Sequence, residues 1–247
     1  MDRLIYTAMS GAKHAFLRQA GVANNLANAS TVGYRSQDHQ FRAVPVQGEG
    51  VPTRAFVVDA SVKDVFDQGT LSYTGRALDV AVQGQGWIAV QAPNGQEVYT
   101  RAGNLQVSAN GQLQTPDGYP VLSPSGPIAV PPDNRVTVAP DGTVSVVPQF
   151  GTPNVTDSVS QIKLVNPDPS TLERGADGFF RLKNGQPADA DPNVRLAPET
   201  LEGSNVNVVD SMVTLISLSR QFEMQVQMLQ KADTNARSAD QLLSLTS

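Results

Sequence analysis

The chain has 247 residues, with 18 lysine and arginine side chains against 23 aspartate and glutamate side chains, so its formal net charge is −5. This acidic balance argues against nucleic acid and anionic membranes as partners, because both are bound by clustered basic side chains. The chain has no cysteine and only two histidines, His14 and His39, so disulfides, thiol catalysis and thiolate zinc sites are excluded.

Residues 1–30 are predicted to form a helix. Small and apolar residues recur along it in steps of three and four, the 3.5-residue period of a coiled-coil seam. The positions are Ile5, Ala8, Ala12, Ala15, Gln19, Val22 and Leu26. Alanine dominates this seam, so a second helix can approach closely. Lys13 and Arg18 interrupt the apolar stretch, so we expect no cleaved secretory signal here.

Three asparagines, Asn24, Asn25 and Asn28, lie where this helix is expected to end. Asparagine is unfavourable inside a helix and tolerates the left-handed conformation of a helix C-terminus. One interpretation is therefore a fraying helix end. The other is that the amides form hydrogen bonds across a packed interface and fix its register. Composition alone does not separate the two.

Residues 31–70 are predicted to be an extended connector, residues 71–190 a β-rich domain, and residues 191–206 a second connector. The β prediction rests on five dipeptides that are typical of tight turns between paired strands. They are Asn94-Gly95, Asn110-Gly111, Asp117-Gly118, Asp141-Gly142 and Asn184-Gly185. Short strands separated by such turns indicate a mainly antiparallel β domain.

Residues 207–247 are predicted to form a second, longer helix, with Asn207 as its N-cap and Asp210 completing a capping-box-like start. Its apolar positions also have a mean spacing of 3.5 residues. They are Val208, Met212, Leu215, Leu218, Phe222, Val226, Leu229, Ala232, Ala236, Ala239 and Leu243. The expected fold class is thus α+β, with two terminal helices pairing as a coiled coil and flanking a central β domain.

The two seams have a consequence for function. Pairing the chain's own ends leaves part of the longer C-terminal seam uncovered, because the N-terminal seam is shorter. Burying a leucine or phenylalanine is worth about 1.5–3 kcal/mol, so uncovered seams should recruit other chains. The sequence therefore predicts a protein that assembles with itself or with partners.

No catalytic, cofactor or metal site is expected. Two S-x-x-K strings, at Ser10 and Ser160, lack the S-D-N and K-T-G motifs that accompany this spacing in acyl-transfer enzymes. Residues 189–200 resemble the start of a calcium loop but lack its glycine and its final glutamate. An enzyme on a β scaffold would need a nucleophile and base that the sequence does not bring together.

Four long motifs resemble those of the flagellar axial proteins of the rod and hook group. They are ANNLANASTVGYR (residues 23–35), FDQGTLSYTGRALDVAVQGQGWIAV (66–90), YTRAGNLQVSANGQLQTPDGYPVL (99–122) and LEGSNVNVVDSMVTLISLSRQFEMQVQML (201–229). The motifs occur in the family's order, and the resemblance extends over nearly the whole chain. The start MDRLIYTAMSGA and the stretch FRAVPV (41–46) look most like proximal-rod members of this basal-body rod family.

The resemblance implies a structural subunit of the bacterial flagellar basal body. Such a subunit would polymerise through its terminal helices into the proximal rod, the periplasm-spanning drive shaft that transmits torque, encloses the export channel and is needed for motility. Its partners would be further copies of itself, other proximal and distal rod subunits, and the flagellar type III export apparatus, which exports it without a cleaved signal. The implied alternatives are a distal-rod or hook-type subunit and, outside the family, a coiled-coil adaptor or export chaperone.

The residues expected at the subunit interface combine both seams with the asparagines that match the family motif. They are Ile5, Ala8, Ala12, Val22, Asn24, Asn25, Leu26, Asn28, Leu215, Phe222, Val226 and Leu229.

Overall fold

The computed structural model describes residues 2–45, 55–131, 134–148 and 157–244. The chain divides into two compact units. The helical unit consists of Met1–Ala29, Ser36–Val65 and Val206–Ser247. The β unit consists of Ser30–Arg35 and Phe66–Asn205.

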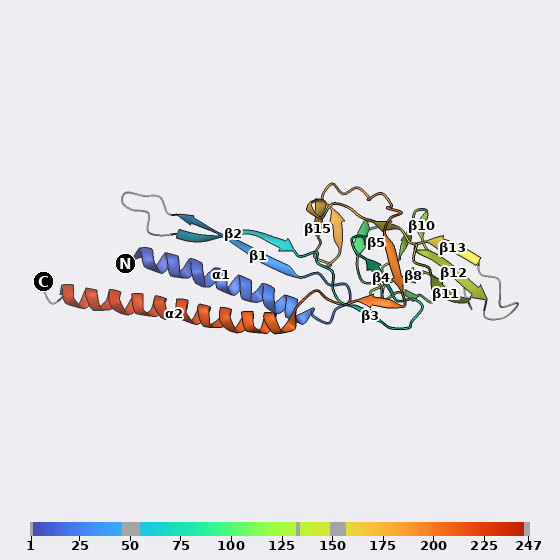
Figure 1. Ribbon diagram of the computed structural model, residues 1–247. Coiled ribbons are helices and arrows are strands. Elements are labelled where there is room, and N and C mark those ends of the chain that lie inside the picture. The colour runs from blue at the N-terminus through green and yellow to red at the C-terminus, as the bar shows by residue number, and fades with distance from the viewer. Residues whose placement is uncertain (1, 46–54, 132–133, 149–156, 245–247) are drawn as a thin grey trace. The chain divides into compact units, whose positions relative to one another are not determined.

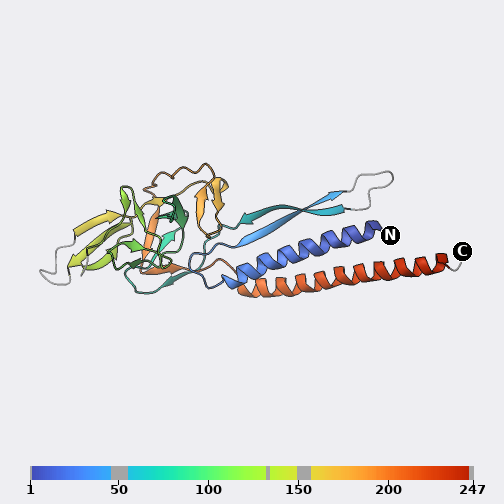
Figure 2. The same ribbon diagram turned by 180° about the vertical axis from the view of Figure 1, so that it is seen from behind.

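The helical unit is built on two helices, α1 (Asp2–Ala27) and α2 (Val208–Ser244). They run side by side in opposite directions, as both views show (Figures 1 and 2). The prediction of two terminal helices that pack together and flank a β domain in the sequence is confirmed.

The predicted cap of α2 is confirmed at the level of single hydrogen bonds. The side-chain oxygen of Asn207 accepts hydrogen bonds from the backbone N–H groups of Val209 (3.0 Å) and Asp210 (3.3 Å). The Asn207 amide in turn donates to the Asp210 carboxylate at 2.7 Å. Two of the N–H groups that a helix start leaves without intrahelical partners are thereby satisfied.

A two-stranded antiparallel ribbon completes the helical unit. It consists of β1 (Gln37–Pro45) and β2 (Ala55–Asp64), with a register shift between Gln40 and Phe41. The ribbon lies alongside α1 (Figures 1 and 2). The sequence predicted only an extended connector here, because residues 37–45 and 55–64 carry none of the five turn dipeptides.

The β unit contains sixteen short strands among the described residues, and all of their pairings are antiparallel. The largest sheet has the order β14-β5-β6-β16-β15, and a second has the order β11-β12-β13. The strands are β3 (Leu71–Tyr73), β4 (Val80–Gln83), β5 (Trp87–Gln91), β6 (Glu97–Thr100), β7 (Gln106–Val107), β8 (Leu113–Gln114), β9 (Leu122–Ser123), β10 (Gly126–Pro127), β11 (Asn134–Val138), β12 (Thr143–Pro148), β13 (Asp157–Gln161), β14 (Leu164–Val165), β15 (Leu172–Arg174), β16 (Phe180–Leu182), β17 (Arg195–Pro198) and β18 (Thr200–Glu202).

Four of the five turn dipeptides lie between two backbone segments that pair with each other. Asn94-Gly95 joins β5 to β6, Asn110-Gly111 joins β7 to β8, Asp141-Gly142 joins β11 to β12, and Asp117-Gly118 lies between the bridged residues Gln114 and Pro120. The fifth, Asn184-Gly185, forms a turn after β16 that connects no strand pair of the described residues. Glycine is required at these turns because each of the five has a positive φ.

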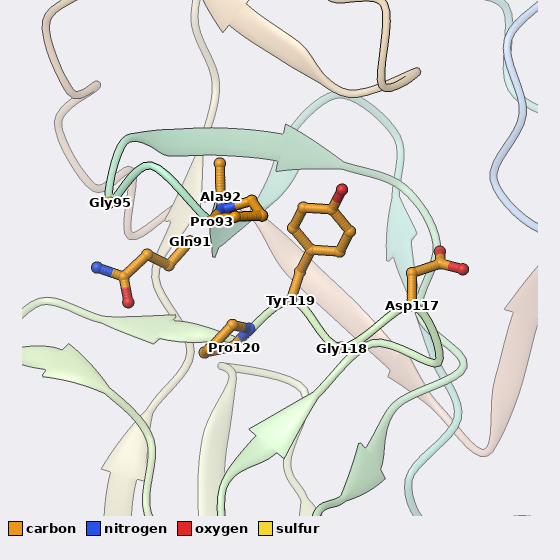
Figure 3. A pocket seen from close by; sticks show the side chains of 8 residues that line it. All are labelled: Gln91, Ala92, Pro93, Gly95, Asp117, Gly118, Tyr119 and Pro120. Carbon is orange, nitrogen blue, oxygen red and sulfur yellow. The ribbon is translucent and has the colours of Figure 1, made fainter.

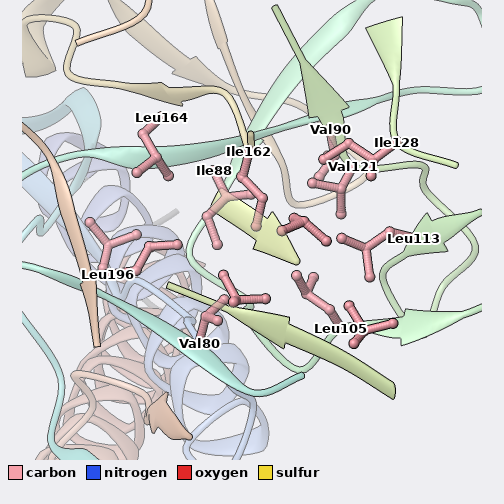
Figure 4. Packing of buried hydrophobic residues seen from close by; sticks show 14 of the residues in the cluster. Val80, Ile88, Val90, Leu105, Leu113, Val121, Ile128, Ile162, Leu164 and Leu196 are labelled. Carbon is pink, nitrogen blue, oxygen red and sulfur yellow. The ribbon is translucent and has the colours of Figure 1, made fainter. Parts of the chain in front are cut away.

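Branched aliphatic side chains from several of these strands form the main core of the β unit. Figure 4 shows Val80, Ile88, Val90, Leu113 and Leu196 converging with their neighbours, and all five are fully buried. A second cluster is aromatic, with the rings of Trp87 and Phe180 4.6 Å apart. The β unit thus has a core of its own, and the helical unit has a separate one.

Candidate assembly site

The seam between α1 and α2 is buried within the chain itself. Ala8, Ala12 and Ala15 of α1 and Leu218 and Ala232 of α2 are all buried. Seven further apolar members of the seam are half-buried; they are Ile5, Val22, Leu26, Leu215, Phe222, Val226 and Leu229. Val208 and Met212, which the spacing also assigned to the α2 seam, are exposed instead, at 39% and 50%. The structure therefore places all nine apolar residues expected at the subunit interface along the paired helices of one chain.

Gly11 sets how closely the two helices approach. A Cβ built on Gly11 would lie 3.1 Å from the side-chain amide of Gln225 on α2. Small residues of α1 therefore face longer residues of α2. Because the helices are antiparallel, the contact of Gly11 with Gln225 fixes their register. Asp2, nine residues before Gly11, then lies opposite Thr234, nine residues after Gln225. Residues 235–244 of α2 therefore extend beyond the start of α1.

A second row of residues with the same 3.5-residue spacing runs along α1, shifted by one position from the inner seam. Every member of this outer row is exposed, and Phe16 is 59% exposed. The members are Tyr6, Met9, Lys13, Phe16, Ala20 and Ala23. Five of the six are apolar or aromatic, which is unusual for a solvated helix face.

The outward side of α2 carries a matching apolar patch over its first turns. Its most exposed members are Val209 and Val213, at 68% and 62%. The outer patch consists of Val209, Met212, Val213, Ile216 and Met224. A shallow hollow in it is lined by Val213, Ile216, Ser217, Arg220, Gln221 and Met224. The helical unit therefore presents two apolar faces on two different helices.

The asparagine cluster divides into two roles. Asn25 is buried, and its side-chain amide donates to the Gln37 carbonyl (2.8 Å) while its side-chain oxygen accepts from the Gln37 N–H (3.0 Å). Asn28 donates to the Asn24 carbonyl at 2.9 Å, which closes the C-terminus of α1. Asn24 is exposed. Asn25 thus fixes the start of β1 to the end of α1 within one chain.

Both histidines lie between α1 and the ribbon. The His14 and Phe41 rings meet edge to face at a centroid distance of 5.2 Å, and the His39 ring is stacked with the Phe41 ring at 6.3 Å. A Cβ on Gly21 would come within 2.4 Å of the His39 ring, so a larger residue there would require that ring to move. These contacts cover a side of α1 that carries neither the inner seam nor the outer row.

The described residues that could suggest catalysis or metal binding do not form a complete site. A pocket in the β unit lies between the turns at residues 92–95 and 117–120, with the Tyr119 ring on its wall (Figure 3). Its eight lining residues include no serine, histidine or lysine. The Lys163 ammonium, which the S-x-x-K spacing would aim at Ser160, instead pairs with Glu97 at 2.8 Å. Within the described ranges, no cluster of three or more His, Asp or Glu could hold a metal ion.

The sequence did not single out the outer row, and Met212 of the outer patch was assigned to the seam that pairs with α1. The signal was present, since residues 6, 9, 13, 16, 20 and 23 repeat the spacing of the inner seam. Spacing alone does not tell which of two adjacent rows faces the chain's own second helix. None of the helices in the described part of the chain is long and apolar enough to span a bilayer.

Three family models match the chain. Residues 5–35 match the model described as flagella basal body rod protein. Residues 81–146 match the flagellar hook protein FlgE/F/G D1 domain, and residues 197–242 match the flagellar basal body rod FlgEFG protein C-terminal model. The outer row lies within the first match, and the whole outer patch lies within the third.

Curated relatives are similar over their whole length. The flagellar basal-body rod protein FlgF of Escherichia coli (strain K12) is 45% identical over 253 residues, covering 100% of both chains. The FlgF protein of Salmonella typhimurium is 44% identical, again over 100% of both chains. The flagellar basal-body rod protein FlgG of Caulobacter vibrioides is 32% identical, covering 96% of this chain and 98% of its own.

Proposed function

The chain belongs to the flagellar basal-body rod protein family, and from that membership we propose that it is laid into the proximal rod by burying its two outward helix faces against neighbouring subunits. As a member of this family it is a structural subunit of the rod and not an enzyme. The observation that carries the proposal is the outer row of α1, because a heptad-spaced apolar row is the pattern by which helices pack on helices.

The proposal assigns different tasks to the two rows of α1. The inner seam pairs α1 with α2 as an antiparallel coiled coil inside each subunit. Its 3.5-residue spacing and the fit of small residues on long ones support this geometry. The nine apolar residues expected at the subunit interface then act by holding the two helices together, and the outer row and outer patch make the direct contacts between subunits.

Contact between an α1 face and an α2 face is heterologous, since the two surfaces consist of different residues. Heterologous contacts that do not close into a ring generate open helical arrays. A rod is such an array. The α1 outer row of one subunit would therefore pack on the α2 outer patch of the next, with Asn24 exposed beside it for a polar contact across the interface.

The proposal that the subunit lies in the proximal part of the rod rests on how similar the chain is to its different relatives. The FlgF relatives at 45% and 44% identity exceed the FlgG relative at 32%. In that position the subunit would span part of the periplasm, enclose the export channel and transmit torque. Delivery through the flagellar type III export apparatus is supported by the lack of cysteine, because no disulfide would have to be broken before an unfolded chain passes.

Charge placed on the outward faces tests the proposal. Phe16→Asp and Ile216→Asp are each expected to abolish incorporation into purified basal bodies and to abolish swimming, in cells that lack their own copy. The matched controls Phe16→Leu and Ile216→Leu keep the face apolar and should be incorporated. The helical circular dichroism of all four purified chains should equal that of the unmodified chain. Rods that contain both Asp variants at normal levels would contradict the proposal.

A further inference from the structure

Glu202, the last residue of β18, receives hydrogen bonds from three separate segments of the β unit. Its Oε1 accepts from the Arg35 guanidinium at 2.6 Å and from the Gly69 N–H at 2.9 Å. Its Oε2 accepts from the Arg101 guanidinium at 3.0 Å, and its backbone carbonyl accepts from the Gly33 N–H at 2.8 Å. The side chains of Arg35 and Glu202 are both 0% exposed.

These segments adjoin the places where the chain passes between its two units. Residues 33–35 lead into β1, Gly69 follows the return from β2, and residues 202–205 lead into α2. Backbone contacts reinforce the junction, since the Asn205 N–H donates to the Tyr34 carbonyl at 3.3 Å. The packing is tight, because a Cβ on Gly69 would come within 2.1 Å of the Gly203 carbonyl oxygen.

Arg35 and Arg101 differ in the number of groups that bind their guanidinium groups. Arg101 donates to the Gly84 carbonyl at 2.7 Å and to the Val82 carbonyl at 3.3 Å, and it lies over the Trp87 ring at 5.4 Å. Burial lowers its pKa, and the charge of Glu202 opposes that shift. Arg101 is thus anchored to strands of the β unit by several groups besides Glu202.

The Arg35 side chain has no comparable set of anchors, although the Arg35 backbone carbonyl accepts a hydrogen bond from the Arg174 guanidinium at 2.5 Å. Its NH2 nitrogen pairs with Glu202, while its Nε and NH1 nitrogens are buried and meet no hydrogen-bond partner among the described residues. A buried cation that loses its partner is strongly destabilised, because the desolvation of the charge is no longer compensated. The seating of the Arg35 side chain therefore depends on Glu202, which lies 167 residues away in the sequence.

We propose that Glu202 is a positioning residue that couples the two ends of the chain: the Arg35 side chain, in the connector before β1, is seated in the β unit only when the connector before α2 is already in place. Arg101 fixes Glu202, and Glu202 fixes Arg35. The coupling has a direction. Removing the Glu202 carboxylate leaves the Arg35 guanidinium buried without a partner, whereas removing the Arg35 guanidinium leaves Glu202 paired with Arg101 and Gly69. Residues 33–35 and 202–205 are then seated together within the β unit, after its last strand has closed.

Hydrogen exchange of the full-length chain, read by mass spectrometry, tests this coupling. In Glu202→Gln, exchange in residues 30–36 should rise at least tenfold, while β5 and β6 remain protected. In Arg35→Met, the rise in residues 30–36 should be smaller, and residues 66–70 should keep their protection. In the double variant, exchange in residues 30–36 should fall below that of Glu202→Gln, because no buried cation is left unpaired.

Glu97→Gln is the matched control, since it breaks another carboxylate–cation pair of the same unit, to Lys163. It should leave residues 30–36 unchanged. Three results would overturn the proposal. One is loss of protection across β5 and β6 in Glu202→Gln, which would make Glu202 a general stabiliser of the core. The second is an equal rise in residues 30–36 and 66–70 in Arg35→Met. The third is a double variant that exchanges as fast as, or faster than, Glu202→Gln.

Discussion

The side-chain amide of Asn25 forms two hydrogen bonds with the backbone of Gln37, one as donor at 2.8 Å and one as acceptor at 3.0 Å. This reciprocal pair satisfies both backbone groups of Gln37 where β1 begins. It explains why an asparagine, a poor residue for a helix interior, stands buried in the last turns of α1. Asn25 acts as a clamp between the helix and the ribbon.

Asn25→Ala should therefore destabilise the helical unit. The substitution leaves two backbone groups of Gln37 without their partners, at a cost of about 1–3 kcal/mol. Asn24→Ala is the matched control, because Asn24 is exposed one residue earlier and gains the same helix propensity. Urea unfolding followed by the helical circular dichroism signal should give a lower midpoint for Asn25→Ala than for Asn24→Ala. Equal midpoints would show that the clamp contributes nothing.

Ala12 should not accept a larger side chain. It is 8% exposed in the inner seam, beside the Gly11 contact with Gln225, so extra methylene groups have no room. Overpacking of this kind costs about 1–3 kcal/mol. Ala12→Leu should lower the thermal unfolding temperature of the helical signal. Ala20→Leu, on the exposed outer row, should leave that temperature unchanged, and the reverse order would mean that the two rows have been assigned to the wrong faces.

Spacing was enough to predict both helices, the α2 cap and most of the turns, because these features depend on residues close together in the sequence. It was not enough to separate the inner seam from the outer row, which share one period. The sequence did not predict the ribbon, because its two strands carry no local turn signal in the described residues. Their pairing runs from Gln37 with Asp64 to Pro45 with Ala55. The junction of Arg35, Arg101 and Glu202 could not be found, because its members are brought together only by the complete β unit.

Trypsin should distinguish the two units in the free subunit. Arg18, Arg220, Lys231 and Arg237 are exposed on the helices, and Arg237 lies beyond the register of α1. Arg237 forms an ion pair with Asp233, and such exposed pairs are worth little. Limited digestion read by mass spectrometry should therefore cut first at these helical sites. First cleavage at Arg101, which is 4% exposed, or at Arg135, with the helices intact, would show that the helical unit is the more stable part.

Phe222→Asp should open the helix pair without unfolding the β unit. Phe222 is half-buried in the inner seam, and a carboxylate there would be desolvated against the alanines of α1. The β unit has separate aliphatic and aromatic clusters, so its near-ultraviolet signal from Trp87 should persist while the helical signal falls. Because assembly is proposed to need both outward faces held on paired helices, the variant should also be absent from purified rods. Phe222→Leu keeps the seam apolar and should retain both the helical signal and incorporation. Normal swimming of cells that carry only Phe222→Asp would mean that pairing of α1 with α2 inside the subunit is not required for the rod.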